Sequence, residues 1–251
     1  MRFPFQVFCL FLLLYLLLSL HIQAQPAGNE KDSLITSAGY TGALQLYHNY
    51  LNPETGLYRG PRYMEYVHTL REGHPYFDDG HMHEGVVFYD KILYEHLLLL
   101  YDLVKGWVVI NDPFNNYKIA LIGEEVDSFA IGAHFFLHLR DSLNPSQPHN
   151  GFYERIYMGR TSLLKKEKEI IEDDLSIPAM GVQHYITHTV SYYLKKGNTY
   201  HAVNNKASLL AAMKDRSKEL RKFIRKNGLG IRKDKENMLL KAAAWYDGFN
   251  Q

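Results

Sequence analysis

The stretch GVVFYDKILYEHLLLLYDLVKGWVVIN, residues 85–111, contains the pattern that decides the fold. It divides into apolar runs of strand length at Gly85–Tyr89, Lys91–Tyr94, Leu97–Val104 and Trp107–Asn111. Lys105-Gly106 separates the last two runs and is typical of a tight hairpin, because glycine readily takes a positive φ. Short strands joined by tight turns pair with antiparallel neighbours, so this stretch predicts a β-meander.

The same pattern extends to both sides of this stretch, over residues 38–203. Runs rich in Tyr, Phe, Val, Ile and Leu recur there between turn residues, for example at Val126–Ile131, His134–Leu139 and Phe152–Tyr157. Short strands at such spacing are typical of a barrel, a sandwich or a strongly curved sheet. The predicted class is α+β: an antiparallel β-meander, barrel-like or forming a strongly curved sheet or sandwich, with a C-terminal two-helix segment.

Residues 204–251 change to the three- and four-residue period of an amphipathic helix. Asn204 or Asn205 can cap the first helix, and Asn227-Gly228 can end it, since glycine takes the left-handed conformation at low cost. A second helix begins at Asp234. We therefore predict a helical hairpin packed on the sheet. The apolar face of its first helix comprises Leu210, Met213, Leu220, Phe223 and Ile224.

The other end of the chain, Met1–Ala24, has the features of a secretory signal peptide. Arg2 precedes the apolar run Val7–Leu20, which is shorter than the roughly 20 residues that span a bilayer, and a small residue ends the segment. The one cysteine, Cys9, lies in that run, so the processed protein contains neither a thiol nor a disulfide. We therefore expect an exported protein of the periplasm or cell surface of a Gram-negative bacterium. After cleavage it has a flexible leader at residues 25–37 and no transmembrane segment.

Several motifs resemble those of a group of bacterial proteins. They are GHPYF at 73–77, GVVFYD at 85–90, LYDLV at 100–104, GFYE at 151–154 and KELRKFIRKN at 218–227. The resemblance covers roughly residues 40–246 and is to uncharacterised exported proteins of the Bacteroidetes. It implies export from a Gram-negative cell and assigns no activity and no catalytic residue.

The densest group of possible metal ligands lies within residues 74–84. It comprises His74, Asp78, Asp79, His81, His83 and Glu84. Imidazoles and carboxylates bind divalent ions, and His81 and His83 would share one face of a strand. Their spacing matches no established metal motif, however, and a polar loop explains the same residues. We expect no metal and no other cofactor, and keep these six residues as candidates.

Two further histidine pairs lie in segments with strand character. In each pair, His134 with His138 and His184 with His188, the residues are four positions apart. Four residues span about 13 Å along a strand, which is too far for two ligands of one ion. We expect ordinary strand histidines at these positions.

Charge is distributed unevenly along the chain. Residues 71–141 contain 12 acidic and 5 basic residues, whereas residues 206–235 contain 11 basic and 3 acidic ones. Two uses of the basic segment are open: it can lie against acidic turns of the sheet, or it can bind another envelope protein or an anionic envelope surface. Export disfavours nucleic acid as a partner. The residues of this possible partner surface are Lys214, Lys218, Arg221, Lys222, Arg225 and Lys226.

Motifs that would identify an enzyme are missing from the sequence. It contains no nucleophile elbow, no phosphate-binding loop and no dinucleotide fingerprint, so no catalytic residue is predicted. We expect a non-enzymatic binding or interaction module of the cell envelope. Two alternatives are a metal-dependent hydrolase that uses the cluster at residues 74–84, and a carrier of a small apolar ligand inside a closed meander.

Overall fold

The computed structural model describes residues 54–67, 70–113, 115, 117–140, 148–174, 182–230 and 234–248. The predicted signal peptide Met1–Ala24, with Cys9, and the predicted leader 25–37 lie outside the described residues, as does the start of the predicted β domain. In the part of the chain that is described, no helix is both long enough and apolar enough to cross a membrane.

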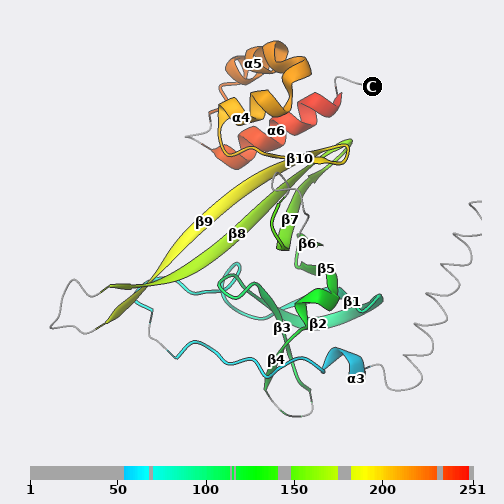
Figure 1. Ribbon diagram of the computed structural model, residues 1–251, viewed down its shortest axis with the longest axis vertical. Helices are drawn as coiled ribbons and strands as arrows, with labels where there is room; N and C mark the ends of the chain where they lie inside the picture. The colour runs from blue at the N-terminus through cyan, green and yellow to red at the C-terminus, as the bar shows by residue number, and fades with distance from the viewer. Residues whose placement is uncertain are drawn as a thin grey trace, which may run out of the picture. The chain divides into compact units, whose positions relative to one another are not determined.

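A ten-stranded antiparallel sheet followed by helices makes up the described fold (Figure 1). The strands are β1 (His83–Tyr89), β2 (Ile92–Asp102), β3 (Trp107–Asn111), β4 (Lys118–Ala120), β5 (Val126–Ile131), β6 (His134–Leu139), β7 (Gly151–Met158), β8 (Thr161–Asp174), β9 (Gln183–Lys196) and β10 (Thr199–Ala202). Their spatial order is β10-β9-β8-β7-β6-β5-β1-β2-β3-β4. The sheet is strongly curved but not closed, because its edge strands β10 and β4 do not pair with each other. The predicted α+β class with an antiparallel sheet is confirmed.

The sheet consists of two meanders rather than one. Strands β1 to β4 pair in sequence order, and so do β5 to β10. The short 3-10 helix η2 (Gly123–Glu125) leads from β4 back to the other side of β1, where β5 pairs with it. Strands β2 to β4 are therefore added on one side of β1, and β5 to β10 on its other side. A local strand pattern does not reveal this change of side.

The β1–β2 hairpin explains why one strand looked like two in the sequence. Asp90 and Lys91 both have positive φ, 47° and 65°, as a two-residue hairpin turn with the twist of the sheet requires. His96 also has a positive φ of 57°, and it lies opposite a shift in register between Gly85 and Val87. The runs on either side of His96 are one strand with a β-bulge.

Residues 61–63 cover the exposed edge of β4. The Tyr63 N–H donates to Lys118 O (2.8 Å), and the Ala120 N–H donates to Pro61 O (3.0 Å). A free strand edge is a site for unwanted pairing with another chain, so this cover protects the sheet.

Residues 70–78 connect strands that are far apart in sheet order. The Arg71 N–H donates to His184 O in β9 (3.0 Å), and the Phe77 N–H donates to Tyr101 O in β2 (2.8 Å). This segment therefore connects β9 to β2, although five strands lie between them in the sheet. The functional candidate site lies along it.

Aromatic side chains from β2, β5, β6 and β7 form the centre of one buried core. The ring centroids of neighbouring residues among Tyr101, Phe129, Phe136 and Phe152 lie between 4.6 and 6.0 Å apart. All four residues are buried. Packing at these distances leaves a filled interior rather than a hollow one.

The C-terminal segment contains three α-helices where the sequence predicted two. They are α4 (Lys206–Ala212), α5 (Ser217–Lys226) and α6 (Lys235–Gly248), and the 3-10 helix η4 (Lys214–Arg216) separates the first two. A short helix α3 (Glu54–Leu57) precedes the sheet. The break begins at Met213, whose backbone leaves the helical region (φ −106°, ψ 43°) while its side chain is fully buried. The turn lets α4 and α5 both direct apolar residues at one core, which a single straight helix could not do.

The buried face of α5 is largely as predicted. Leu220 and Ile224 are fully buried in a cluster that includes Leu163 of β8 and Leu194 of β9. Phe223 departs from the expectation, since it is only half-buried and stacks on Trp245 of α6 with ring centroids 5.2 Å apart. The helices therefore dock on the sheet through Leu220 and Ile224, while Phe223 joins two helices.

Candidate functional site

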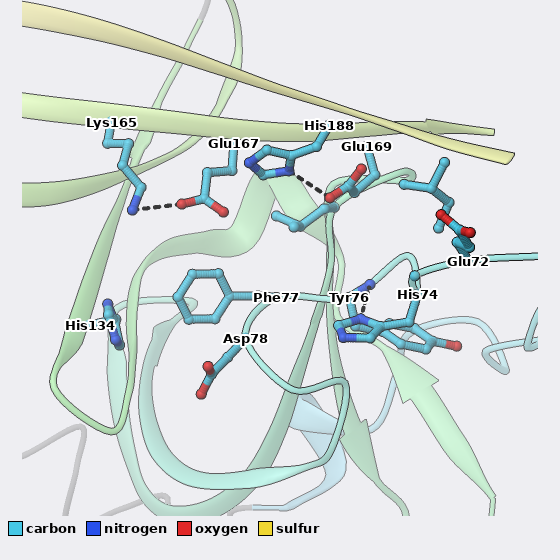
Figure 2. A pocket seen from close by; sticks show the side chains of 13 residues that line it. Glu72, His74, Tyr76, Phe77, Asp78, His134, Lys165, Glu167, Glu169 and His188 are labelled. Carbon is cyan, nitrogen blue, oxygen red and sulfur yellow. Dashed lines mark hydrogen bonds and ion pairs between the residues drawn. The ribbon is translucent and has the colours of Figure 1, made fainter. Parts of the chain in front are cut away.

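A polar cavity of about 570 Å³ lies between residues 72–78 and strands β6, β8 and β9 (Figure 2). We call it the acidic cleft. Figure 2 shows side chains of β8 and β9 pointing toward the segment that carries His74, Phe77 and Asp78. The cleft is lined by Glu72, Gly73, His74, Tyr76, Phe77, Asp78, Leu103, His134, Lys165, Glu167, Glu169, Ile186 and His188.

Strand β8 supplies most of the charge through its two-residue period. Lys165, Glu167 and Glu169 alternate along the strand and so project from one face. On the same strand, the Glu169 N–H donates to Leu103 O in the turn after β2 (3.2 Å). This contact anchors β8 against a strand that is not its neighbour in the sheet.

One end of the cleft holds a lysine among carboxylates. Lys165 Nζ lies 2.6 Å from Glu167 Oε1, 3.0 Å from Glu154 Oε2 and 3.4 Å from Glu236 Oε2 of α6. Burial by itself would lower the pKa of Lys165, but the hydrogen bonds to Glu167 and Glu154 outweigh it and raise the pKa above its ordinary value. This part of the cleft stabilises a positive charge.

Two histidines that line the cleft each pair with a glutamate. His188 Nδ1 lies 2.6 Å from Glu169 Oε1, and His134 Nδ1 lies 2.5 Å from Glu154 Oε1. An ionised carboxylate only accepts hydrogen bonds, so each imidazole donates through Nδ1. The four residues came from strands that the sequence treated separately.

Glu169 is the least satisfied of these groups. The residue is 7% exposed, and its Oε2 is buried without a hydrogen-bond partner among the described residues. An ionised oxygen removed from water without a partner costs free energy, so such atoms are rare in folded proteins. Because Glu169 also lines the cleft, its uncompensated carboxylate is a candidate group for binding a ligand.

The charges in the cleft do not balance. Four lining carboxylates face one lysine, a formal charge of −3 when the imidazoles are neutral. Within the described ranges, no lysine or arginine nitrogen lies within 4.0 Å of a carboxylate oxygen of Glu72, Asp78 or Glu169. The cleft is therefore acidic over most of its length.

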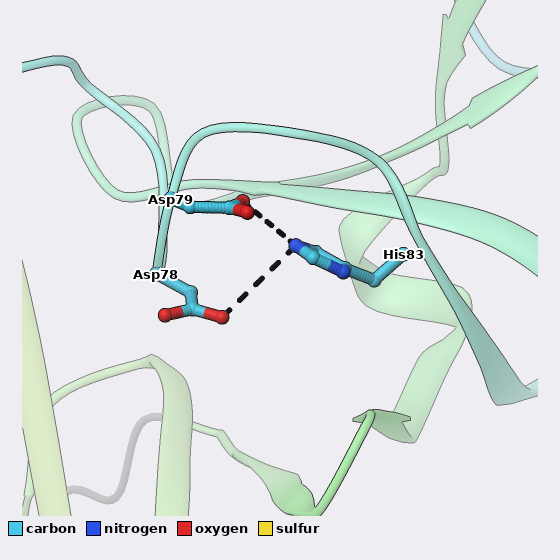
Figure 3. A group of neighbouring side chains, drawn as sticks. All are labelled: Asp78, Asp79 and His83. Atoms are coloured by element: carbon cyan, nitrogen blue, oxygen red, sulfur yellow. Dashed lines mark hydrogen bonds and ion pairs between the residues drawn. The ribbon is translucent and has the colours of Figure 1, made fainter.

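The six metal candidates from the sequence divide into three locations. Asp78, Asp79 and His83 come together, with ligand atoms within 4.8 Å of one another (Figure 3). His83 Nε2 lies 2.7 Å from Asp79 Oδ1 and 4.0 Å from Asp78 Oδ2. Both aspartates are exposed, so this trio is a shallow group at the surface.

Of the other three candidates, His81 lies beside the trio, whereas Glu84 and His74 lie elsewhere. His81 precedes β1 and is exposed, with Nδ1 3.4 Å from Asp79 Oδ1. Because β1 begins only at His83, the two histidines do not share a strand face as expected. Glu84 instead pairs with His96 of β2 (2.7 Å). His74 lines the acidic cleft and stacks on Tyr76 with ring centroids 6.3 Å apart.

Sequence reasoning missed the main residues of the cleft. His134 and His188 lie on strands as predicted, but each has a glutamate partner and lines the cavity. The run of charged residues Lys165–Glu169 was a visible signal, because a strand that is charged on both faces must place both in polar surroundings. The pattern does not say what faces them.

The basic residues of α5 face away from the buried side of the helix. Lys218, Arg221, Lys222, Arg225 and Lys226 are all exposed. Among the residues that the structure describes, none of these five forms an ion pair within 4.0 Å.

In the ion pairs between the helical segment and the sheet, the acidic residue lies in the helical segment and the basic residue lies in a strand. Helix acids meet strand lysines, with Asp215 2.7 Å from Lys196 and Glu236 3.4 Å from Lys165. Of the two uses left open for the basic segment, ion pairing with acidic turns of the sheet is not seen for these five basic residues of α5 within the described part of the chain. The apolar side chains of the helices dock them, and the basic residues remain available at the surface.

Fold and site together define an open antiparallel sheet with C-terminal helices and an acidic cleft. Comparison with family models, curated proteins and solved structures found no match for this chain. The function is therefore argued from the cleft itself.

Proposed function

We propose that this protein is an exported, non-enzymatic binding module of the cell envelope, and that the acidic cleft holds its ligand. One observation carries the proposal: Glu169, a residue that lines the cleft, has a buried carboxylate oxygen without a hydrogen-bond partner among the described residues. A protein that folds around such an atom loses stability unless a bound group compensates for it. A ligand that binds the folded protein offsets this loss of stability.

The location in the envelope rests on the N-terminal sequence. The apolar run Val7–Leu20 behind Arg2 is typical of a cleaved export signal. The resemblance to exported Bacteroidetes proteins supports the same compartment. Detection of an N-terminus near Gln25 on protein from the envelope fraction would test this part of the proposal.

A metal-dependent hydrolase remains the second candidate because one residue links the two sites. Asp78 lines the acidic cleft and also belongs to the trio with Asp79 and His83. An ion at that trio would lie at the rim of the cleft, where it could act on a bound molecule. The exposure of both aspartates favours the binding module, since catalytic ions are usually held by ligands fixed through further hydrogen bonds.

A carrier of an apolar ligand receives less support from the structure. Such a carrier needs a hollow apolar interior, whereas the rings of Tyr101, Phe129, Phe136 and Phe152 pack against one another in the core. The cavity that does open on the sheet is lined by charged side chains.

Variants of two isoleucines test whether the cleft binds a ligand. Ile186 of β9 lines the cleft, so Ile186→Trp should fill it and abolish binding. Ile170 of β8 is exposed and alternates with Glu169, so it faces the other side of the sheet. Ile170→Trp adds the same ring outside the cleft and is the matched control.

The measurement is equilibrium dialysis against a small-molecule extract of the producing cells, read by mass spectrometry. The wild type and Ile170→Trp should enrich the same compounds and return them chemically unchanged. Ile186→Trp should enrich none of them. Equal enrichment by Ile186→Trp would contradict the cleft as the site, and chemical conversion of an enriched compound would make the protein an enzyme.

The proposed module has a partner surface at the exposed basic residues of α5. Five cations without an ion pair in the described structure form a face that is complementary to an anionic envelope surface. Half-buried Phe223 and Trp245 adjoin this face and line a shallow groove with Lys222 and Lys226. Aromatic rings beside basic residues are typical of contacts with a lipid interface.

A further inference from the structure

We propose that the ligand of the acidic cleft is an organic ammonium ion, a small molecule that carries at least one protonated amine. This inference rests on the proposed function and names the ligand class of the same site. It starts from the three carboxylates that have no lysine or arginine partner in the described structure, those of Glu72, Asp78 and Glu169.

Glu169 is the buried one of these three carboxylates. Because Glu169 is largely removed from water, its charge is screened less than that of an exposed carboxylate. The electric field that it produces in the cleft is therefore stronger. His188 occupies only Oε1, and it compensates the charge only when its ring carries both protons. A ligand cation held in the cleft would lie in this field and compensate the charge of the carboxylate.

The cleft already holds one ammonium group, that of Lys165. Its Nζ lies within 3.4 Å of three carboxylates, and the hydrogen bonds to two of them, Glu167 and Glu154, outweigh the effect of burial and raise the pKa of Lys165. An ammonium ion has three donors and no acceptor, which suits a wall of carboxylate oxygens. The carboxylates of Glu169, Glu72 and Asp78 line the rest of the cleft without a lysine or arginine partner in the described structure.

The remaining walls favour an organic cation over a bare metal ion. Phe77, Leu103 and Ile186 line the cleft with carbon, which a metal ion cannot use but an alkyl skeleton can cover. The single described trio whose ligand atoms lie close enough to hold an ion is Asp78, Asp79 and His83, of which only the exposed Asp78 lines the cleft. An anion is excluded by the formal charge of the lining residues.

A pair of probes tests the charge directly. 1,4-Diaminobutane and butane-1,4-diol have the same four-carbon skeleton, but only the diamine carries ammonium groups at pH 7. The experiment is a calorimetric titration of the protein as purified from the producing cells, with no domain removed. The diamine should bind at least about tenfold more tightly than the diol. Equal affinities, or no binding of the diamine, would overturn the inference.

Variants then locate the effect. Glu169→Gln removes the buried charge and should weaken diamine binding roughly tenfold or more. Glu172→Gln, an exposed position on β8, is the matched control and should bind like the wild type. Because Glu169→Gln could also disturb folding, Asp78→Asn at an exposed position provides a second test and should weaken binding by about threefold. Wild-type affinity in both cleft variants would contradict the assignment.

The outcomes separate this inference from the proposed function. If dialysis finds cellular compounds that Ile186→Trp no longer retains, the cleft is a binding site. Failure of the diamine would then refute the ammonium class alone. If no compound is retained and no diamine binds, the binding function fails as well.

Discussion

Asp102 illustrates how a single buried charge holds an irregular segment. It is completely buried and accepts hydrogen bonds from the Tyr63 hydroxyl (2.8 Å), the Tyr66 hydroxyl (2.9 Å) and the Lys105 N–H (2.8 Å). Lys105 Nζ lies 4.4 and 4.5 Å from the centroids of the two tyrosine rings. Residues 63–67, which resemble a strand in sequence, are therefore held largely by side chains.

Asp79 is the residue whose titration tests the surface trio. The backbone hydrogen bond from His81 and the side-chain hydrogen bond from His83 lower the pKa of Asp79 to about 2. Because the folded pKa is depressed, the contribution of this carboxylate to stability is complete above its ordinary value of 3.8 and is lost as pH falls through about 2.

We expect His83→Ala to raise the pKa of Asp79 only part of the way to its ordinary value, since the His81 N–H still donates to Oδ1. Carboxyl chemical shifts measured by NMR against pH check this. An unchanged pKa in His83→Ala would show that His83 does not hold the carboxylate.

At the scale of elements, capping decides where the helices begin. The Asn205 side chain accepts from the Ser208 N–H (2.8 Å), and Ser208 Oγ accepts from the Asn205 N–H (3.1 Å), which is a reciprocal capping box. The predicted cap is thus confirmed at Asn205. The break at Met213 was missed because no proline or glycine marks it.

Two substitutions in α5 separate docking on the sheet from packing between helices. Leu220 is fully buried, so Leu220→Ala should lower the free energy of unfolding by about 2–5 kcal/mol. Phe223 is half-buried against Trp245, so Phe223→Ala should cost less, about 1–2 kcal/mol.

Urea denaturation of both variants measures the two free energies. Lys222→Ala, at an exposed position of the same helix, is the control and should change stability little. A larger loss for Phe223→Ala than for Leu220→Ala would show that the helix docks through its aromatic residue.

At the scale of the whole described chain, the acidic cleft and the basic face of α5 are two surfaces of opposite charge. The cleft lies along β8 and β9 with residues 72–78, and the basic face lies on the exposed side of α5. They are made by different elements, so a substitution in one should leave binding at the other unchanged. A module with both surfaces could attach to an anionic surface while it holds a cation.

Vesicle binding tests the partner surface. The full chain should co-sediment with phosphatidylglycerol vesicles and not with phosphatidylcholine vesicles, and high salt should release it. Arg221→Glu with Arg225→Glu should weaken binding by roughly thirtyfold or more, because each cation near an anionic membrane contributes about 1 kcal/mol.

The matched control reverses two exposed lysines elsewhere, Lys168 of β8 and Lys206 of α4, to Glu. This variant should keep most of the binding. Equal loss in both variants would mean that net charge, rather than the α5 face, decides the interaction. Preference for a soluble acidic peptide over the vesicles would replace the lipid surface by an acidic protein partner.

The sequence by itself determined most strands of this protein and the amphipathic character of its C-terminal helices, but neither the bulge in β2 nor the break at Met213. Strand runs, the turn at Lys105-Gly106, the cap at Asn205 and the buried positions Leu220 and Ile224 could be predicted because each depends on residues within one or two turns of the backbone. Side-chain period and turn dihedrals are local properties.

Only the tertiary structure decided the site. The cleft joins His74 to Glu169 and His188, residues separated by about a hundred positions, through the curvature of the sheet and the hydrogen bonds of residues 70–78. The pairing of β5 with β1 reverses the order of strands, and a bulge at His96 shifts the register. These features arise from long-range pairing and packing, which no local period specifies, so the residues that form the cleft could not be identified as neighbours in advance.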